Sequence, residues 1–363
     1  MKINRRSFIK SASAGAAMLT LPTVTPLFGR KKDDKLGVAL VGLGYYSTDL
    51  LAPALQLTQH CELRGFVTGT PEKIPVWQKK YGISDGNVYN YGNMADIANN
   101  DDIDVIYIVL PNSMHSKYSV IAAETGKHVW CEKPMAKTVE DCQAIIDACR
   151  KNKVKLSIGY RMQHEPNTRK IIGWAETKPY GPMIGLSGRA GYRESRQGHW
   201  KLNREMGGGA MYDMGVYPLN AVRYASNMEP IAVSARYEYT RPELFTDVDE
   251  ITHFTLEFPG GITASCTTSF AESLNTLEVN CRDGWYKLEP FQAYNGIQGI
   301  TSDGTRLDAR IPNQQARQMD DNAMAIMEDK NVLVPGEEGL RDIRIVEAIH
   351  ESARNGSRRI ELT

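Results

Sequence analysis

The feature that most constrains the fold is a regular alternation of apolar runs and helical patterns between Leu36 and Gly159. The apolar runs are short and bounded by turn residues, as in buried strands, and the segments between them have helical periodicity. Because parallel strands need a long crossover between them, this order is typical of a doubly wound parallel sheet. It predicts strands at 36–41, 62–68, 105–110, 128–131 and 155–159, and helices that end near 58, cover 74–81 and 115–125, and start at 138.

The second half of the chain has a different pattern, in which most apolar runs follow one another without helices. Turn residues such as Pro259-Gly260-Gly261 separate these runs, as in an antiparallel meander. The runs predict strands at 183–191, 231–239, 251–258, 262–270 and 276–281, one helix after Gly207-Gly208-Gly209, and two last helices at 314–329 and 337–355. We therefore expect an α/β protein with a Rossmann domain at 35–160 and an α+β domain at 161–363, whose mainly antiparallel sheet has one open face.

Charge and cysteine content argue against several classes of protein. The chain has 43 Lys and Arg and 43 Asp and Glu, so its net charge is zero and no global basic field attracts nucleic acid. Its six cysteines form no Cys-x-x-Cys pair, which favours buried free thiols. The seven histidines show no metal-ligand spacing, and we expect no metal.

The first 30 residues are expected to be a targeting segment. Arg5-Arg6 precede Ser7-Phe8-Ile9-Lys10 and an Ala-rich stretch too short to span a membrane. This pattern resembles a twin-arginine signal, which implies export of the folded protein to the periplasm by the twin-arginine machinery. No clear Ala-x-Ala site precedes Arg30, so removal of the segment and its retention as a membrane anchor both stay open.

A glycine-rich turn follows the first expected strand. Gly42-x-Gly44-x-x-Ser47 has the context of a dinucleotide fingerprint, with a strand before it and a helix after it. Gly42 permits the tight turn, and Gly44 lets backbone amides approach a pyrophosphate at the helix N-terminus. Ser47 replaces the third glycine and is small enough for close packing. The alternative is a plain loop between a strand and a helix.

The end of the second strand indicates which dinucleotide binds. An acidic residue there usually contacts the adenosine ribose of NAD, but this chain has Thr68. Thr70 and Lys73 are suited to donate to a 2'-phosphate, which favours NADP over NAD. Thr70-Pro71 is also an ordinary helix start, with a capping threonine before a proline, and both interpretations can hold.

A lysine lies at the exit of the strand at 128–131. Pro134 has no N–H for the sheet ladder and ends the strand, which leaves Lys133 at the carboxyl edge where ligands collect in such sheets. Glu132 and Lys133 are either a solvated charge pair or part of a site.

Asp213 and Tyr217 are four residues apart, so on a helix they share a face. A free tyrosine has a pKa near 10, and a nearby ammonium lowers it. We therefore pair Tyr217 with Lys133: tyrosine takes the proton of a sugar hydroxyl as hydride leaves, lysine polarises the oxygen, and Asp213 orients the lysine or binds a substrate hydroxyl. The alternative is that Tyr217 only packs at an interface.

Six motifs, in this order, resemble those of the glucose-fructose oxidoreductase family, from about Leu36 onward. They are Val41-Gly42-Leu43-Gly44, Leu110-Pro111-Asn112-Ser113-Met114-His115, Cys131-Glu132-Lys133-Pro134, Gly159-Tyr160-Arg161, Gly207-Gly208-Gly209 with Asp213 to Tyr217, and Gly336-Glu337-Glu338-Gly339. Many members of the wider superfamily have histidine where Tyr217 stands, so tyrosine resembles the glucose-fructose type.

This resemblance implies tightly bound NADP, a C-terminal sheet used to form a homo-oligomer (dimer or tetramer), and oxidation of an aldose to its lactone with reduction of a second sugar. The catalytic residues implied are Lys133, Asp213 and Tyr217. The cofactor contacts expected are Gly42, Gly44, Tyr45, Tyr46, Thr68, Thr70, Lys73, Leu110, Pro111, Asn112, His115, Glu132, Lys133 and Arg161. The sugar contacts expected are Lys133, Arg161, Trp200, Arg204, Asp213 and Tyr217.

Two of these assignments have structural alternatives, because Arg161 also suits an ion pair at a domain boundary and Trp200 a buried core position. Two other functions also stay open for the whole chain. One is a retaining glycosidase that uses NAD transiently, and the other is a sugar- or nucleotide-binding regulator without catalysis.

Overall fold

A parallel sheet with the order β3-β2-β1-β4-β5-β6 forms the first half of the described chain. The computed structural model describes residues 35–362, so the expected signal segment at 1–30 lies outside the described residues. The strand order confirms the doubly wound Rossmann fold. The strands are β1 (Leu36–Val41), β2 (Cys61–Val67), β3 (Val88–Tyr89), β4 (Val105–Ile108), β5 (His128–Cys131) and β6 (Leu156–Ile158).

The helices of this half are α1 (Ala52–Ala54), α2 (Ile74–Tyr81), α3 (His115–Glu124) and α4 (Val139–Lys151). Thr138 caps α4, since its hydroxyl accepts a hydrogen bond of 3.1 Å from the Asp141 amide. The first helix differs from the expectation of a continuous helix to about 58. A π-helical turn, Tyr46–Leu51, precedes the short α1. Pro53 has no N–H to extend an α-helical ladder at this point.

The second sheet has the order β14-β13-β12-β11-β7-β10-β9-β8-β15, and only its β7–β10 pair is parallel. This confirms the mainly antiparallel sheet. Its strands are β7 (Met183–Gly191), β8 (Ala232–Glu238), β9 (Ile251–Glu257), β10 (Thr263–Ser269), β11 (Leu274–Cys281), β12 (Gly284–Leu288), β13 (Gly299–Thr301), β14 (Arg306–Leu307) and β15 (Ile360–Glu361). β3 and β13 to β15 had no sequence signal, because two or three residues are too few to show a clear alternation, and the five-residue β12 was also not predicted.

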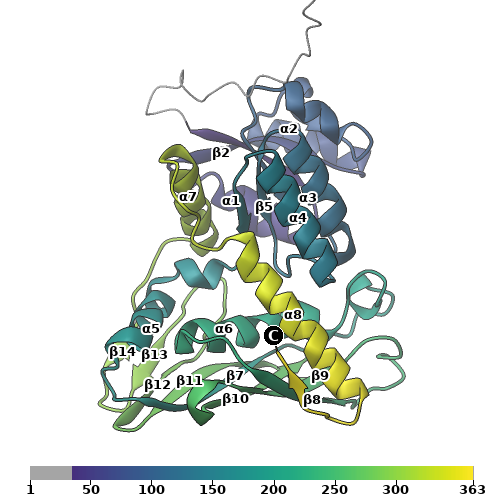
Figure 1. The fold of residues 1–363 in the computed structure, drawn as a ribbon. Helices are drawn as coiled ribbons and strands as arrows, with labels where there is room; N and C mark the ends of the chain where they lie inside the picture. Colours follow the sequence, from purple (N-terminus) through teal and green to yellow (C-terminus); the bar gives the residue numbers. More distant parts are fainter. Residues whose placement is uncertain (1–34, 363) are drawn as a thin grey trace, which may run out of the picture. The chain divides into compact units, whose positions relative to one another are not determined.

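Helices α5 (Pro166–Thr177), α6 (Val216–Ser226) and α8 (Gly336–Arg354) cover one face of the second sheet (Figure 1). The opposite face has no helix over it in the part of the chain that the structure describes. The sequence patterns did not predict α5, although Pro166 at its first position and Glu165 as its cap are helix-start signals. The Glu165 carboxylate accepts a hydrogen bond of 2.7 Å from the Thr168 amide.

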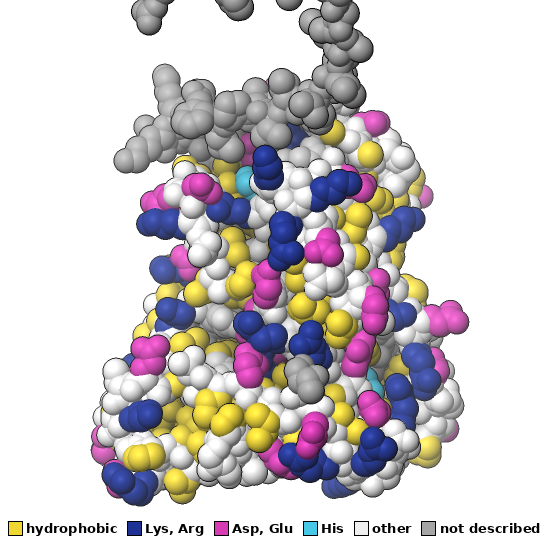
Figure 2. Space-filling view, in the orientation of Figure 1, with side chains coloured by type: hydrophobic (Ala, Val, Ile, Leu, Met, Phe, Trp, Pro, Cys, Tyr) yellow, Lys and Arg dark blue, Asp and Glu magenta, His cyan; other side chains and the backbone are white. Residues whose placement is uncertain are grey.

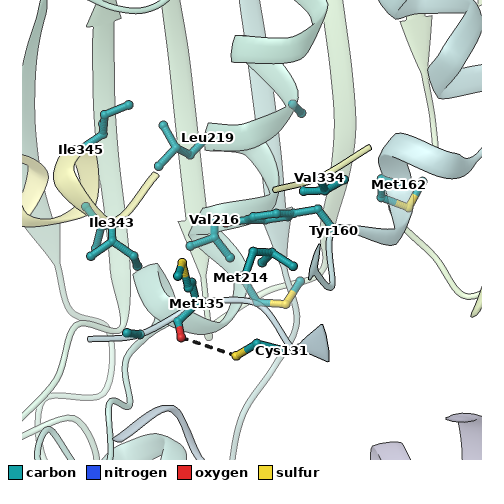
Figure 3. Close-up of a cluster of buried hydrophobic side chains, with 14 of the residues drawn as sticks. Cys131, Met135, Tyr160, Met162, Met214, Val216, Leu219, Val334, Ile343 and Ile345 are labelled. Carbon is teal, nitrogen blue, oxygen red and sulfur yellow. Dashed lines mark hydrogen bonds between the residues drawn. The ribbon is translucent and has the colours of Figure 1, made fainter. Parts of the chain in front are cut away.

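One apolar core joins the two sheets beneath the turn that follows β5 (Figure 3). Cys131 and Met135, on either side of this turn, pack with Val216 and Leu219 of α6 and with Ile343 of α8. The Cys131 thiol also donates to the Met135 carbonyl, over 3.6 Å. The turn that carries Lys133 is therefore held against the start of α6.

Helix α7 (Gln314–Met327) comes from late in the chain but packs on the first sheet (Figure 1). Its Met319 and Ala323 belong to the same buried cluster as Leu40 of β1 and Trp130 of β5. The first sheet thus completes its core with a C-terminal helix. The domain division at 160/161 stays a prediction, because residues from 35 onward form one compact unit.

Acidic and basic side chains intermingle over the face shown in Figure 2, in keeping with the zero net charge. All six cysteines are buried and free. Among residues 35–362, no cluster of His, Cys, Asp and Glu is arranged to hold a metal ion, and no helix is long and apolar enough to cross a membrane.

Candidate functional site

The glycine-rich turn after β1 has the shape that a dinucleotide requires. Gly42 has φ +92°, and a Cβ there would lie 2.4 Å from the Val109 carbonyl oxygen, so only glycine fits. The Ser47 hydroxyl donates to the Gly42 carbonyl at 2.6 Å and fixes the turn. A Cβ on Gly44 would meet no atom within 4 Å, so space is open in front of this backbone. Backbone amides at this helix start can therefore receive a pyrophosphate.

The end of β2 lies beside this turn. Thr68 is buried, and its hydroxyl accepts from the Thr70 amide at 3.1 Å. The Lys73 ammonium reaches back and donates to the Leu43 carbonyl at 2.6 Å. Hydroxyls and a lysine thus border the glycine-rich turn, and no carboxylate occupies the position of Thr68. This donor set suits a phosphate better than a pair of ribose hydroxyls.

The turn after β5 carries Lys133 into contact with the second half of the chain. Its ammonium donates to the Asp213 carbonyl at 2.7 Å and lies 3.9 Å from the Asp213 carboxylate. It also lies 4.5 Å from the centre of the Tyr217 ring. The side chains of Lys133 and Asp213 are each only 12% exposed, so Lys133 is not a solvated surface charge.

A second π-helical turn, Met211–Gly215, positions Asp213 immediately before α6, which carries Tyr217. Gly209 precedes it with φ +112°, and a Cβ there would lie 2.2 Å from the Asp249 carboxylate. The Asp249 carboxylate accepts a hydrogen bond of 2.8 Å from the Met211 amide and so fixes the turn. Tyr46 and Asp213 thus both lie in π-helical turns, which often mark functional sites.

Arg161 makes the contact to Tyr217 that the sequence analysis had assigned to Lys133. The guanidinium is 2% exposed and donates to the Tyr217 hydroxyl at 2.8 Å. Burial alone would raise the pKa of Tyr217, but Arg161 and then Lys133 outweigh it and hold the pKa below its ordinary value. The sequence analysis paired Tyr217 with Lys133 and did not find the cation that bonds its hydroxyl.

Glu132, next to Lys133 in the chain, is buried. Burial raises the pKa of its carboxyl group, and its Oε1 accepts from the Tyr107 hydroxyl at 2.5 Å. The same hydroxyl accepts from Gln318 of α7 at 3.1 Å, so this network ties the Lys133 turn to α7. A Cβ on Gly159 would lie 2.7 Å from Glu132 Oε1, which leaves room for glycine only.

His115 and Asn112 hold loops together. The two ring nitrogens of His115 lie 2.8 Å from the Pro134 and Leu110 carbonyls, and burial lowers the pKa of the ring. A neutral ring has one N–H, so it donates to one carbonyl at a time. Asn112, which follows Pro111, donates to the Gly207 carbonyl at 2.7 Å and joins the two halves of the site.

Three further residues at the site were not assigned roles from sequence. Lys201 donates to the Asp213 carboxylate at 2.6 Å and to the Tyr192 hydroxyl at 3.1 Å. The ring of Tyr294 lies 4.9 Å from the Arg161 guanidinium carbon. Lys201 stood in the segment 200–204, which was expected to line the sugar pocket through Trp200 and Arg204, and Tyr294 stood in a loop without a motif, so no local signal marked a role for either residue.

The remaining expected site residues are spread more widely. Tyr46 packs on Tyr294, with ring centres 6.0 Å apart, whereas Tyr45 is 65% exposed. Trp200 is half-buried, and the Lys201 ammonium lies 5.9 Å from its ring. Arg204 has an exposed side chain that donates to the Asp247 carbonyl at 2.9 Å, and its assignment to the sugar site stays a prediction.

A surface cavity of about 590 Å³ lies next to Trp200, and it is separate from the contacts around Tyr217. Its lining residues are Gln197, Gly198, His199, Leu202, Asn203, Glu243 and Leu244. None of the expected catalytic residues lines it.

Two segments of the chain match known families. Residues 36–160 match an oxidoreductase family with an NAD-binding Rossmann fold, and residues 179–287 match the GFO/IDH/MocA C-terminal domain. D-xylose 1-dehydrogenase (NADP(+)) of Haloarcula marismortui is 30% identical over 339 residues, which cover 90% of this chain and 93% of that protein. A second such enzyme, from Haloferax volcanii, is 26% identical over 332 residues, with 89% and 97% coverage.

Among solved structures, aldose-aldose oxidoreductase from Caulobacter crescentus, complexed with glycerol, superposes with a TM-score of 0.87. It is 36% identical, and the match covers 91% of this chain and 100% of that one. The chain therefore belongs to the GFO/IDH/MocA family of NAD(P)-dependent oxidoreductases, the glucose-fructose oxidoreductase family that its motifs had indicated.

Proposed function

We propose that this enzyme oxidises C1 of an aldopyranose to a lactone with tightly bound NADP, and then reduces the carbonyl group of a second sugar. The observation that carries this proposal is the environment of Tyr217. Its hydroxyl accepts a hydrogen bond of 2.8 Å from Arg161, and the Lys133 ammonium lies 4.5 Å from the centre of its ring. A phenol between two cations is suited to lose a proton and act as a general base near neutral pH.

NADP, when bound, supplies the hydride acceptor at its nicotinamide ring. In the first half-reaction, the Tyr217 phenolate takes the proton of the C1 hydroxyl as C1 loses its hydride, and C1 becomes the lactone carbonyl. In the second, Tyr217 returns this proton to the carbonyl oxygen of the second sugar as the carbonyl carbon gains the hydride. Arg161 and Lys133 stabilise the phenolate that is present before the first half-reaction and again after the second, and Asp213 holds Lys133 through its backbone carbonyl.

The choice of sugar and of NADP rests on the relatives and on the donor set beside β2. The two xylose dehydrogenases carry NADP(+) in their names, and the structural relative is an aldose-aldose oxidoreductase. Thr68, Thr70 and Lys73 provide hydroxyl and ammonium donors near the glycine-rich turn, as a 2'-phosphate would need.

Cofactor released from the purified protein tests this function. We expect denatured protein to release NADP in a near-equimolar amount, and we expect aldose added to native protein to reduce it without free cofactor. The variant Y217F should retain NADP but lose about 10²- to 10⁴-fold in the rate of reduction, the usual contribution of a general base. Protein without cofactor that needs free NAD would contradict tight binding. Cleavage of a glycoside without net reduction would favour the glycosidase.

We also propose export to the periplasm and assembly through the open face of the second sheet. The Arg5-Arg6 pattern supports export, and the face without a helix supports assembly. Replacing both arginines with lysine should keep the enzyme in the cytoplasmic fraction. Light scattering on the purified protein should give the mass of a dimer or tetramer.

A further inference from the structure

A second lysine binds the carboxylate of the site. Lys201 donates to Asp213 Oδ2 at 2.6 Å, while Lys133 lies 3.9 Å from Oδ1 of the same group. The two lysines come from unrelated segments, since Lys133 follows β5 and Lys201 lies in the loop after β7. Asp213 is therefore held from two sides, and the Lys201 side is formed by the second half of the chain.

Lys201 donates to a hydrogen-bond network in which acceptors outnumber the protons of the other side chains. The Tyr192 hydroxyl lies 3.1 Å from Asp213 Oδ2 and 3.1 Å from Glu194 Oε2, but it has one proton to donate. The Glu194 carboxylate also accepts hydrogen bonds from the Arg196 guanidinium and amide. Lys201 supplies N–H groups to both Tyr192 and Asp213, which offsets the negative charge of the two carboxylates.

Lys201 also has capacity left for a ligand. An ammonium has three N–H donors, and the two contacts described above use two of them. Its side chain is 21% exposed, so a small molecule can reach it. Trp200 lies beside it, with the Lys201 ammonium 5.9 Å from the indole ring, and an indole offers a flat apolar face for a pyranose.

We propose that Lys201 determines substrate specificity: it donates a hydrogen bond to an aldose hydroxyl remote from C1 and at the same time positions Asp213. This proposal rests on the proposed function and adds the group that recognises the far end of the sugar. Tyr217 and Lys133 act at C1, whereas Lys201, Tyr192 and Trp200 form the end of the site that distinguishes one aldose from another.

The test compares the variants K201M and K201R on a parent aldose and on the deoxy sugars that each lack one hydroxyl other than that at C1. With K201M, we expect KM for the parent sugar to rise about 10- to 100-fold, as for loss of a charged hydrogen bond, with a smaller change in kcat. For one deoxy sugar, wild type and K201M should have equal KM, because the partner hydroxyl is already absent. K201R should recover part of the loss.

One control variant and one outcome separate this proposal from a structural role of Lys201. The variant K287M removes another ion-paired lysine, 3.0 Å from Glu289 and 34% exposed, and should leave all sugars unchanged. Equal losses with K201M on the parent and on every deoxy sugar would overturn the proposal, since they would mean that Lys201 only positions Asp213.

Calorimetric titration of sugar into the protein as purified provides a readout that does not depend on steady-state turnover, since the bound NADP is reduced at most once. Weaker binding of the parent aldose to K201M, with NADP content unchanged, supports the proposal even if the second half-reaction is not observed. If wild type binds an aldose but does not reduce its NADP, the proposed function fails and the specificity proposal stands. Unchanged sugar binding in K201M would sink the specificity proposal alone.

Discussion

The guanidinium of Arg161 donates a 2.8 Å hydrogen bond to the hydroxyl of Tyr217, and its carbon lies 5.4 Å from the centre of the same ring. The arginine also lies 4.9 Å from the ring of Tyr294. A fully ionised cation is thus held between two tyrosines, and one of them is the proposed base. This contact connects the segment after β6 with α6, and it sets the protonation of the site.

Replacing Arg161 should move the pH dependence of sugar oxidation. In the proposed mechanism oxidation uses the Tyr217 phenolate, so kcat/KM should rise with pH as the phenol loses its proton. Burial raises the pKa of Tyr217, and Arg161 is the first group that lowers it, so R161M should shift the rising limb to higher pH. The measurement is the pH profile of kcat/KM. K133M should shift it in the same direction but less, and a limb that stays in place in R161M would contradict this assignment.

Removal of the Tyr294 ring should weaken retention of the cofactor. This ring packs 6.0 Å from Tyr46, at the start of the helix that follows Gly44, and also contacts Arg161. Loss of an aromatic and cation contact of this kind costs about 1 kcal/mol, so Y294A should release NADP roughly fivefold more readily. Cofactor content after dialysis measures this. Y239A is the control, because Tyr239 is 43% exposed against 41% for Tyr294, and it should retain NADP like wild type.

The buried ion pair between α6 and α8 should contribute strongly to stability. Arg223 bonds to Asp342, and their side chains are 2% and 0% exposed. Removing one partner leaves a buried charge, so R223L should lower the free energy of unfolding by about 3–5 kcal/mol in urea denaturation. The exposed pair Arg282 and Asp283 is the control, and R282L should leave the free energy of unfolding nearly unchanged. A small effect of R223L would mean that water solvates Asp342.

Acid should destabilise the enzyme through His128. Burial lowers the pKa of His128 to about 4. Its Nδ1 accepts a hydrogen bond of 3.0 Å from the Lys155 amide, and this bond requires that Nδ1 carries no proton. Between pH about 4 and 6.5 the unfolded chain binds the proton and the folded chain does not, so the free energy of unfolding rises with pH and falls on acidification. The contribution is at most about 3 kcal/mol. H128N should flatten the pH dependence of urea midpoints in this window; an unchanged slope would assign the effect to other buried histidines.

Local patterns predicted much of this fold because they depend on neighbours in the chain. The alternation from Leu36 to Gly159 indicated the parallel sheet, and the strands at β1, β5 and β7 have the expected bounds. The short strands β13 to β15 were missed, since two or three residues have no detectable period. The packing of α7 on the first sheet was also not predictable, because periodicity shows which face of a helix is apolar but not what covers it.

The sequence by itself indicated the dinucleotide turn at Gly42 and Gly44, the lysine at the exit of β5, and Asp213 and Tyr217 as neighbours of that lysine. Each depends on glycine geometry, on proline ending a strand, or on the spacing of one helical turn. Only the tertiary structure decided that Arg161 bonds Tyr217, that Lys201 bonds Asp213, and that Tyr294 packs on Tyr46. These partners lie on segments far apart in the chain. They meet because the two sheets share one buried core, which no local pattern encodes.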